Sequence, residues 1–418
     1  MEFDRNAKEG PLTHCQVCGS GNLELVIDLG HQPLCDSLLS EENLKRTEVT
    51  YPLRQMRCVD CTNNQLDYVV ASKTVYHAEY PYKSGVTKEL VTYQRAMAKS
   101  IVEALSLPRG AFVVDFGSND GTLLAGFQAL GMSVLGVEPT NIAKLAIEAG
   151  IPTRKAFFNS ATAEEIVDAH GRASLITATN VFAHMADLGS VMEGIRTVLA
   201  DDGVFVTESH YLLDILEKVQ YDSIYHEHIR SYSLRALVTL CEAYGLHIFR
   251  AVRGDRYAGN IRIFAAQAGR RSDDGTVAQL LKLEHESGIS DPRTYQQFRD
   301  AVETSRYQLM EFLVSGRQRG RDIVGKACPG RCSTLLNYCG VDRGYLRYLS
   351  EQEASLKVGL HLPGKHIPIV ADSQLLADNP DDIIIMAWHY KDAIVQYLRD
   401  LGVTSRIHVP LPEFERVA

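Results

Sequence analysis

Long apolar runs, a basic leader and an excess of positive charge are all missing from this sequence. No stretch of roughly 18 or more apolar residues occurs in the chain, which excludes a typical membrane-spanning helix. The first residues, Met1 to Arg5, lack the basic-then-apolar layout of a secretion signal, so we expect a cytoplasmic protein with no membrane partner. The 52 acidic and 43 basic residues give a net charge of −9, which argues against a nucleic-acid partner but leaves room for a local basic pocket.

Cysteine is also scarce for a chain of 418 residues. Nine cysteines are too few for a disulfide scaffold, and in a reducing compartment they are expected to be thiols or metal ligands. Two Cys-x2-Cys pairs occur near the N-terminus, formed by Cys15 with Cys18 and by Cys58 with Cys61. Four thiolates in two knuckles indicate a closed tetrahedral zinc site with a structural role, and the alternative is four free thiols. Cys35 is left over in this scheme, and we expect it to be a small buried hydrophobic residue.

Strand-like and helix-like patterns alternate from about residue 88 onward. Apolar strands are predicted at 112–116, 133–138, 151–154, 173–178 and 203–208, and helical patterns follow them. This alternation is typical of a parallel sheet with helices on both faces, and a second α/β pattern begins at Asp322. We therefore predict an α/β protein with three domains, a zinc-binding β domain (1–75), a cofactor-binding domain (76–310) and a C-terminal α/β domain (311–418).

The turn after the first of these strands is the strongest candidate for a ligand site. It reads Asp115-Phe116-Gly117-Ser118-Asn119-Asp120-Gly121 and opens a helix at the carboxyl end of the strand, where ligands of doubly wound sheets bind. The turn is not G-x-G-x-x-G, so it is a poor fit to a pyrophosphate. Glu138, at the end of the next strand, is suited to accepting both hydroxyls of a ribose. Dehydrogenases share this pattern, and an ordinary strand–helix turn is a further alternative.

Three motifs resemble those of class I methyltransferases, namely the turn 115–121, the segment Gly136-Val137-Glu138-Pro139 and the segment Thr179-Asn180-Val181-Phe182-Ala183-His184. Together with Tyr225-His226-Glu227-His228, they resemble the C-methyltransferases that act on nucleotide-linked 4-ketosugars in deoxysugar biosynthesis. The resemblance covers nearly the whole chain. It implies a Rossmann-like methyltransferase core, a small N-terminal zinc domain, a C-terminal Rossmann-like lobe and S-adenosylmethionine as the cofactor. The residues it places around this cofactor are Gly117, Asn119, Asp120, Glu138, Asn180 and Phe158.

Methylation at carbon needs a base that removes a proton from the carbon and donors that stabilise the resulting enolate. Histidine suits the role of base because its ordinary pKa of about 6.5 is close to the working pH. From the resemblance we assign His228 as general base, Glu227 as its orienting partner and Tyr225 as a donor to the enolate or the sugar. His184 is a second acid–base candidate, and Tyr80 of the Tyr-Pro-Tyr segment is expected to enter the site.

The resemblance also implies contacts to the nucleotide-sugar. The residues expected to make them are Tyr82, Asn260, Arg262, Arg331 and Lys357. Three features depart from the family pattern, and one is that the Asp and Pro that normally precede the lysine at Lys357 are missing. Tyr257 stands where the family has histidine, and Arg331 stands where a lysine is expected after a glycine-rich turn. Arginine can still clamp a phosphate in a bidentate manner.

The leading interpretation is an S-adenosylmethionine-dependent C-methyltransferase that deprotonates C3 of a nucleotide-linked 4-ketosugar and methylates it. Methylation at C5 of a related sugar is a close variant, because both carbons flank the ketone. A second class is an NAD-dependent sugar oxidoreductase or epimerase, for which we find no Tyr-x-x-x-Lys pair after the fourth strand. A third is a non-enzymatic zinc-knuckle module. We expect a monomer or a weak homodimer.

Overall fold

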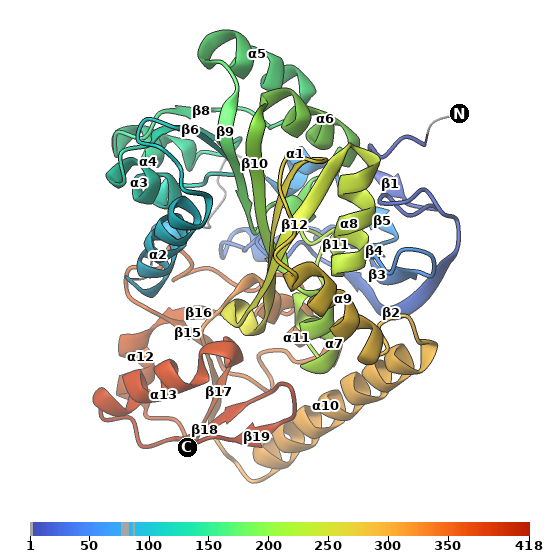
Figure 1. Ribbon diagram of the computed structural model, residues 1–418. Coiled ribbons are helices and arrows are strands. Elements are labelled where there is room, and N and C mark those ends of the chain that lie inside the picture. The colour runs from blue at the N-terminus through green and yellow to red at the C-terminus, as the bar shows by residue number, and fades with distance from the viewer. Residues whose placement is uncertain (1–2, 77–82, 87) are drawn as a thin grey trace.

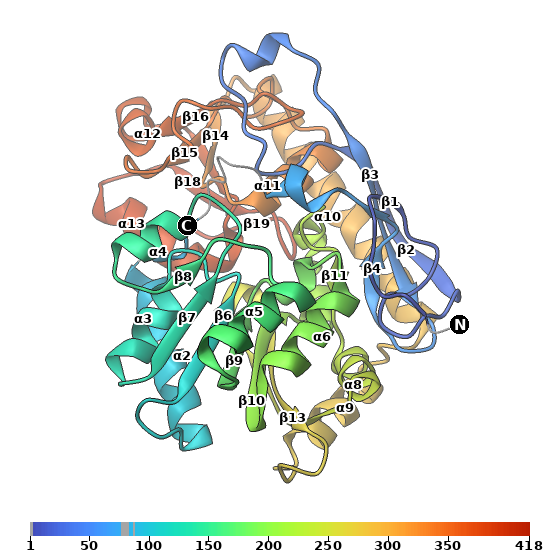
Figure 2. The ribbon, with the colours of Figure 1, turned by 90° about the horizontal axis from the view of Figure 1, so that it is seen from above.

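The structure of the chain is a computed structural model that describes residues 3–76, 83–86 and 88–418. Figures 1 and 2 show three larger sheets, an N-terminal sheet in blue, a seven-stranded sheet in cyan to yellow, and a C-terminal sheet in orange and red. The long helix α10 (Pro292–Gln318) contacts strands of the first and the third of these. It crosses residue 310, so the boundary proposed at that position falls inside a helix.

The N-terminal sheet is antiparallel, with the strand order β11-β4-β3-β2. Its strands are β2 (Leu23–Gln32), β3 (Tyr51–Cys58), β4 (Asn64–Leu66) and β11 (Arg230–Ser231), and beside them lie the pair β1 (Gly10–Pro11) and β5 (Tyr68–Val69) and helix α1 (Ser72–Val75). Strand β11 belongs to the middle of the chain. It pairs with β4 through Arg230 opposite Gln65 and Ser231 opposite Asn64. The segment that follows the Tyr225–His228 motif is therefore anchored to the zinc-binding region.

The seven-stranded sheet has the order β12-β13-β10-β9-β6-β7-β8, and β13 is antiparallel to both of its neighbours. Its strands are β6 (Phe112–Phe116), β7 (Ser133–Val137), β8 (Thr153–Arg154), β9 (Ala173–Thr179), β10 (Leu199–His210), β12 (Leu246–Gly254) and β13 (Asn260–Gln267). The predicted strands of this domain are confirmed. The chain turns outward in opposite directions after β6 and β9, and the carboxyl ends of these two central strands mark the switch point where ligands of such sheets bind.

Helices cover both faces of this sheet because its strands are apolar on both sides. They are α2 (Lys88–Leu105), α3 (Thr122–Ala129), α4 (Ala143–Glu148), α5 (Ser160–His170), α6 (Leu188–Val198) and α8 (Leu234–Ala243). Side chains of β6 alternate between the faces. Val113 shares a buried cluster with Ile101 of α2 and Phe127 of α3, whereas Val114 lies in the cluster that contains Ile166 of α5. The core is thus built from two apolar layers with the sheet between them.

The C-terminal sheet has the order β16-β15-β14-β17-β18-β19 and is parallel except for its last strand. Its elements are β14 (Ile323–Lys326), α11 (Gly330–Cys339), β15 (Leu349–Glu351), β16 (Ile369–Ala371), α12 (Asp372–Asp378), β17 (Asp382–Ile385), α13 (Lys391–Asp400), β18 (Arg406–Val409) and β19 (Glu415–Arg416). The switch point of this second sheet lies between β14 and β17. The predicted C-terminal α/β unit is confirmed as a Rossmann-like sheet.

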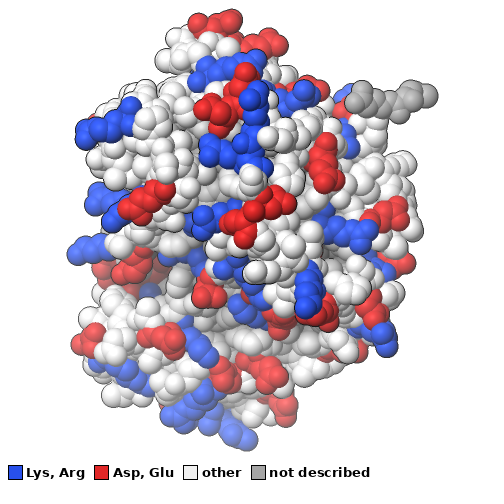
Figure 3. Space-filling model, in the orientation of Figure 1, with Lys and Arg blue, Asp and Glu red and all other residues white. Residues whose placement is uncertain are grey.

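Helices α7 (Leu212–Glu217) and α9 (Thr276–Glu286) complete the fold. Helix α10 begins at Pro292 after the cap residue Asp291, whose carboxylate accepts a hydrogen bond from the N–H of Arg293. Among the described residues, no helix combines the length and the apolar composition that crossing a bilayer requires. Basic and acidic side chains are interspersed over the face drawn in Figure 3.

Candidate active site and zinc site

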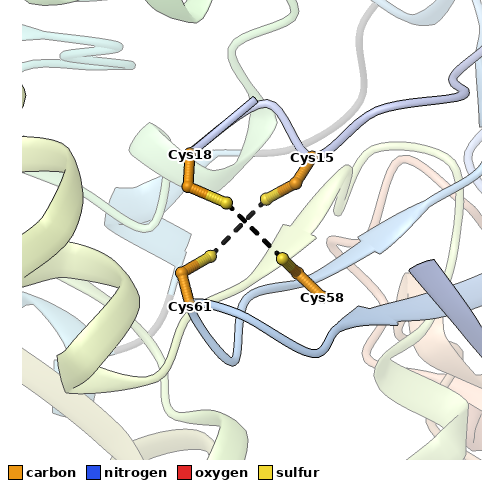
Figure 4. A group of neighbouring side chains, drawn as sticks. All are labelled: Cys15, Cys18, Cys58 and Cys61. Carbon is orange, nitrogen blue, oxygen red and sulfur yellow. Dashed lines mark hydrogen bonds between the residues drawn. The ribbon is translucent and has the colours of Figure 1, made fainter. Parts of the chain in front are cut away.

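The four cysteines of the two N-terminal pairs converge on one point (Figure 4). The Sγ atoms of Cys15 and Cys61 are 3.6 Å apart, those of Cys18 and Cys58 are 3.5 Å apart, and all four lie within 4.8 Å of one another. Zinc–sulfur bonds of about 2.3 Å put the corners of a tetrahedron about 3.8 Å apart, so this donor set fits one Zn²⁺. Four thiolates leave no position for water or substrate, and the zinc is structural.

Matching turns aim the two pairs of thiols at each other. The N–H of Gly19 donates to the carbonyl of Cys15 at 2.8 Å, and the N–H of Thr62 donates to the carbonyl of Cys58 at 3.0 Å. Gly19 and Thr62 both have positive φ, 79° and 61°, which closes each turn tightly. The Thr62 hydroxyl also lies 2.7 Å from the hydroxyl of Ser233, at the start of α8. The zinc knuckle therefore contacts the domain of the seven-stranded sheet directly.

The predicted cofactor turn depends on a close approach at Gly117. This glycine follows β6 with a φ of +64°, and its N–H donates to the carbonyl of Val137 at 2.8 Å. A Cβ at this position would lie 2.4 Å from Cγ2 of Val181, which belongs to the loop after β9. The two loops at the switch point touch here, and only glycine leaves space between them. The absence of a side chain keeps the backbone N–H groups of the turn close to the cleft.

Glu138 lies at the carboxyl end of β7, as predicted, and it is buried. One carboxylate oxygen accepts the N–H of Asn119 at 3.0 Å, and the other accepts the N–H of Thr140 at 2.9 Å. Each oxygen keeps a second lone pair, so the carboxylate can also accept the two hydroxyls of a ribose. Two backbone N–H groups thus hold Glu138 in place, and its contact to a ribose remains a prediction.

Asn119 and Asp120 bind a backbone segment in this structure. The side-chain oxygen of Asn119 accepts the N–H of Ser84 at 2.8 Å, and a carboxylate oxygen of Asp120 accepts the N–H of Gly85 at 2.6 Å. The segment that precedes α2 is thereby held against the cofactor turn. The contacts of these two side chains to the methionine part of the cofactor remain a prediction.

Asn180 and Phe158 complete the set assigned to the cofactor. Asn180 has a φ of 53°, and its buried side-chain oxygen has no hydrogen-bond partner among the described residues. A buried acceptor without a partner at the switch point fits a ligand that supplies a donor. Phe158 is stacked on Phe116, with ring centroids 4.4 Å apart, and this face of Phe158 is closed to an adenine ring. Together with Gly117 and Glu138, the site fits S-adenosylmethionine.

Three histidine rings, those of His184, His210 and His228, lie close together. The centroid of His228 lies 4.8 Å from that of His184 and 4.9 Å from that of His210, and the three come from different segments of the chain. Burial lowers the pKa of both His184 and His210 to about 3, and it holds the pKa of His228 well below its ordinary value of 6.5. All three rings are therefore neutral near pH 7, and neutral imidazole is the form that accepts a proton.

The tautomer of His228 follows from its hydrogen bond. Nδ1 of His228 lies 2.7 Å from the carbonyl oxygen of Ser223, and a carbonyl can only accept, so Nδ1 carries the hydrogen. Nε2 is left unprotonated and free to act as a base. The ring of Tyr225 lies 3.9 Å from the His228 ring between centroids. The backbone of Ser223 thus orients His228 at Nδ1, where we had expected Glu227.

Glu227 contacts the zinc-binding region. The thiol of Cys35 donates to its carboxylate at 3.4 Å, and burial keeps the pKa of Cys35 well above 9, so the thiol retains its proton. The prediction that Cys35 is buried is confirmed, but it also binds a polar partner. Cys35 and Asp36 follow β2, and both approach Gly330 at the start of α11. Segments of all three sheets meet at Glu227.

His184 lies in the short helix after β9, as its motif implied. Its Nδ1 is 3.0 Å from the hydroxyl of Tyr76, and the two rings are stacked within 9° of parallel. Burial raises the pKa of Tyr76 well above 10, so its hydroxyl remains protonated. The predicted site residues Tyr80 and Tyr82 lie outside the described residues.

The two cationic side chains of the C-terminal domain that we expect to bind the substrate, Arg331 and Lys357, already have partners within the protein. Nε of Arg331 lies 3.1 Å from a carboxylate oxygen of Asp222, and the guanidinium also donates to Gln220 at 2.9 Å. Lys357 donates to the carbonyl of Cys328 at 2.8 Å and lies 3.6 Å from Asp36. The charge of each is balanced inside the protein. Phosphate binding by Arg331 and Lys357 remains a prediction.

Arg262 and Asn260 lie on β13, near the carboxyl end of β10. Nε of Arg262 donates to Glu208 at 2.9 Å, and the guanidinium also contacts the hydroxyl of Tyr93 at 3.1 Å. The side-chain nitrogen of Asn260 is buried and has no hydrogen-bond partner among the described residues. Asn260 therefore offers a donor to a ligand, whereas Arg262 is engaged by Glu208. The roles of both toward the substrate remain predictions.

Sequence reasoning missed His210 and gave no role to Arg256. His210 ends β10 and supplies the third ring of the cluster, and Arg256 lies in the short helix η5 (Arg256–Ala258) after β12. The position of His210 at the carboxyl end of a central strand was a signal that could have found it. Arg256 carries no local signal, because its neighbours come from distant segments.

Family models match the chain in three consecutive blocks. A "Putative zinc binding domain" matches residues 15–76, a "Methyltransferase domain" matches residues 91–250, and a "C-methyltransferase C-terminal domain" matches residues 255–412. The chain is 34% identical to the C-methyltransferase NovU of Streptomyces niveus over 406 residues, which cover 96% of each protein. It is 30% identical to a ubiquinone biosynthesis O-methyltransferase of Rhodopseudomonas palustris over 106 residues, 25% of this chain and 42% of that protein.

Similar solved structures cover less than half of the chain. An S-adenosylmethionine-dependent methyltransferase from Clostridium acetobutylicum covers 43% of this chain and 92% of its own, with 14% identity and a TM-score of 0.35. The CcbJ methyltransferase from Streptomyces caelestis covers 47% and 96%, with 14% identity and a TM-score of 0.34. The family follows from the full-length relative and from the three matched blocks. The chain belongs to the C-methyltransferase family and is an S-adenosylmethionine-dependent methyltransferase with an N-terminal structural zinc site.

Proposed function

We propose that this C-methyltransferase acts on a nucleoside-diphosphate-linked 4-keto-deoxysugar and methylates a carbon next to its ketone, with C3 favoured. The observation that carries the proposal is the state of His228. Its Nδ1–H is bound to the Ser223 carbonyl at 2.7 Å, and its Nε2 is unprotonated inside a cluster of neutral rings. Such a base can accept the proton of a carbon acid activated by a ketone.

S-adenosylmethionine, when bound, supplies an electrophilic methyl group. His228 accepts the proton of the carbon next to the ketone at Nε2. Burial raises the pKa of Tyr225 well above 10, so its hydroxyl stays protonated and can donate to the enolate oxygen. His184, held by Tyr76, is a second acid–base group on the same side. The three domains 1–75, 76–310 and 311–418 would provide the zinc support, the cofactor cleft and the nucleotide site respectively.

Hydrogen exchange separates the base from methyl transfer. In D₂O with S-adenosylhomocysteine present, the wild-type enzyme should introduce deuterium at C3 of a 4-keto sugar nucleotide, and with methyl-labelled S-adenosylmethionine it should place the label on the same carbon. His228→Asn should slow both reactions by about 10²- to 10⁴-fold while binding of S-adenosylhomocysteine survives. NMR of the product distinguishes methylation at C3 from methylation at C5.

A matched control lies two residues away. His226 contacts the carbonyl of Pro52 through Nε2 at 3.2 Å, and it faces the zinc-binding region rather than the histidine cluster. His226→Asn should therefore keep the exchange rate within several-fold of wild type. Unchanged exchange in His228→Asn would move the role of base to His184 or His210. No methyl transfer to any of a panel of dTDP-, CDP- and GDP-linked 4-ketosugars would refute the substrate class. The oxidoreductase and the non-enzymatic alternatives are excluded by the family of the chain.

A further inference from the structure

The C-terminal sheet has a switch point of its own, where sheets of this kind place a ligand crevice. Ligands of open α/β sheets bind at the switch point, which here lies between the loop after β14 and the loop after β17. The loop after β17 carries Trp388, His389 and Tyr390. Side chains of the seven-stranded sheet domain reach this crevice, because the ring of Tyr257 lies 6.4 Å from that of His389 and 6.5 Å from that of Tyr390. A ligand in the crevice would contact both domains.

Most cations around this crevice are neutralised. Arg331 pairs with Asp222 at 3.1 Å, Arg253 pairs with Asp214 at 2.9 Å, and Arg262 pairs with Glu208 at 2.6 Å. The carboxylate partner compensates the charge of each of these arginines, which weakens its attraction for a phosphate. The free positive charge must therefore come from another side chain.

Arg256 is that side chain. Its guanidinium carbon lies 4.8 Å from the ring centre of Tyr93, 5.0 Å from that of Tyr257 and 5.7 Å from that of Tyr390. No carboxylate lies within ion-pairing distance of it among the described residues, and its buried Nε has no hydrogen-bond partner there. Aromatic faces stabilise a guanidinium without neutralising it. Arg256 thus presents an uncompensated charge that is held in place between the two domains.

The backbone that carries Arg256 is strained. Tyr257 and Ala258 have φ of 55° and 66°, and Gly259 has φ of 138°. The carbonyl of Ala258 accepts hydrogen bonds from Lys218 at 2.7 Å and from Gln220 at 3.0 Å, which hold the loop in this shape. Two successive non-glycine residues in the left-handed region are costly and persist where surrounding contacts enforce them, commonly at ligand sites. The strain points Tyr257 toward His210, 5.8 Å away between ring centroids.

A series of ring contacts leads from Arg256 through Tyr257 to the base. Ring contacts connect Tyr257 to His210 at 5.8 Å and His210 to His228 at 4.9 Å. We propose that Arg256 binds the diphosphate of the nucleotide-sugar, with the sugar lying along Tyr257 toward His228. This inference rests on the proposed function for the class of substrate, and it assigns to Arg256 the phosphate contact that the sequence had suggested for Arg331.

Isothermal titration of the full-length, zinc-loaded protein with bound S-adenosylhomocysteine tests the assignment. The probes are dTDP, CDP and GDP, together with the corresponding nucleosides. Arg256→Met keeps much of the aliphatic stem that packs on the tyrosine rings but loses the charge. It should weaken binding of the preferred diphosphate by about 10- to 100-fold and leave binding of its nucleoside unchanged. Arg256→Lys should recover part of the loss.

Arg250 provides the control. It lies on β12, its guanidinium carbon is 5.4 Å from the ring centre of Phe264, and its Nε is 3.5 Å from Asp274. Arg250→Met should leave both affinities unchanged. Equal diphosphate affinity in Arg256→Met and wild type would overturn the inference, as would a selective loss in Arg331→Met alone. A general loss of structure would weaken the binding of diphosphate and nucleoside alike. The ratio of the two affinities within each variant therefore reports the phosphate contact alone. If wild type binds none of the three diphosphates, the substrate class itself is wrong.

Discussion

Alanine at Gly117 perturbs the point where the two loops of the cofactor cleft touch. The new Cβ would lie 2.4 Å from Cγ2, 2.8 Å from Cβ and 2.9 Å from Cγ1 of Val181, whereas ordinary contacts begin near 3.4 Å. Two costs add. A φ of +64° costs alanine about 1 kcal/mol relative to glycine, and overpacking costs about 1–3 kcal/mol more. We expect the free energy of unfolding of this domain to fall by about 2–4 kcal/mol.

Cofactor binding should suffer as well. The turn must retreat by roughly 1 Å to restore an ordinary contact, which disturbs the hydrogen bonds that Gly117 donates to Val137 and that Asn119 donates to Glu138. A loss of about 1.4 kcal/mol in binding corresponds to a tenfold weaker dissociation constant, and we expect at least this for S-adenosylhomocysteine. Isothermal titration measures the affinity, and urea unfolding followed by intrinsic fluorescence measures the stability.

Two further variants isolate the contact. Gly110 has a φ of +80° and no atom within 4 Å of the position that an added Cβ would take, so Gly110→Ala carries the backbone cost alone and should keep full affinity. In the Gly117→Ala background, Val181→Ala removes the nearest methyl groups and should restore part of the lost affinity. If Gly117→Ala binds S-adenosylhomocysteine as tightly as Gly110→Ala does, the contact with Val181 does not shape the cofactor turn.

The remaining predictions concern pH and zinc. Because burial holds the pKa of His228 well below 6.5, the base stays neutral as the pH falls through 6.5, and kcat/KM should decline only at lower pH; an acidic limb at 6.5 or above would contradict this. The fold itself also loses stability at low pH. Burial lowers the pKa of His184 to about 3, so below about pH 6.5 this histidine takes up a proton in the unfolded state but not in the folded state. As a control, each sample is therefore returned to pH 7.5 and its activity is measured again. Cys58→Ser should lose the zinc and most of the methyl transfer, because the segment after His228 pairs with the zinc-binding region through β11 and β4. Metal analysis should give about one zinc per wild-type chain. Full activity of the variant without zinc would refute this coupling between the zinc site and catalysis.

Local patterns were sufficient for the elements of the fold and for two kinds of site. The Cys-x2-Cys spacing predicted the zinc cluster because each knuckle is a single turn, formed by residues that are neighbours in the chain. Apolar strands at 112–116 and 133–138 predicted the parallel sheet, and Glu138 followed from its place at a strand end. These features depend on contacts within a few residues, and such contacts are encoded locally.

Charges and neighbours from distant segments were decided only by the tertiary structure. The sequence does not show that Arg331 pairs with Asp222, nor that Tyr390 and Tyr93 lie around Arg256. The orientation of His228 by a backbone carbonyl is equally invisible in a string of residue types. Residue type and spacing determined which groups could do chemistry. Which of them keep a free charge or a free lone pair depended on long-range packing, because a partner far away in the chain can neutralise any one of them.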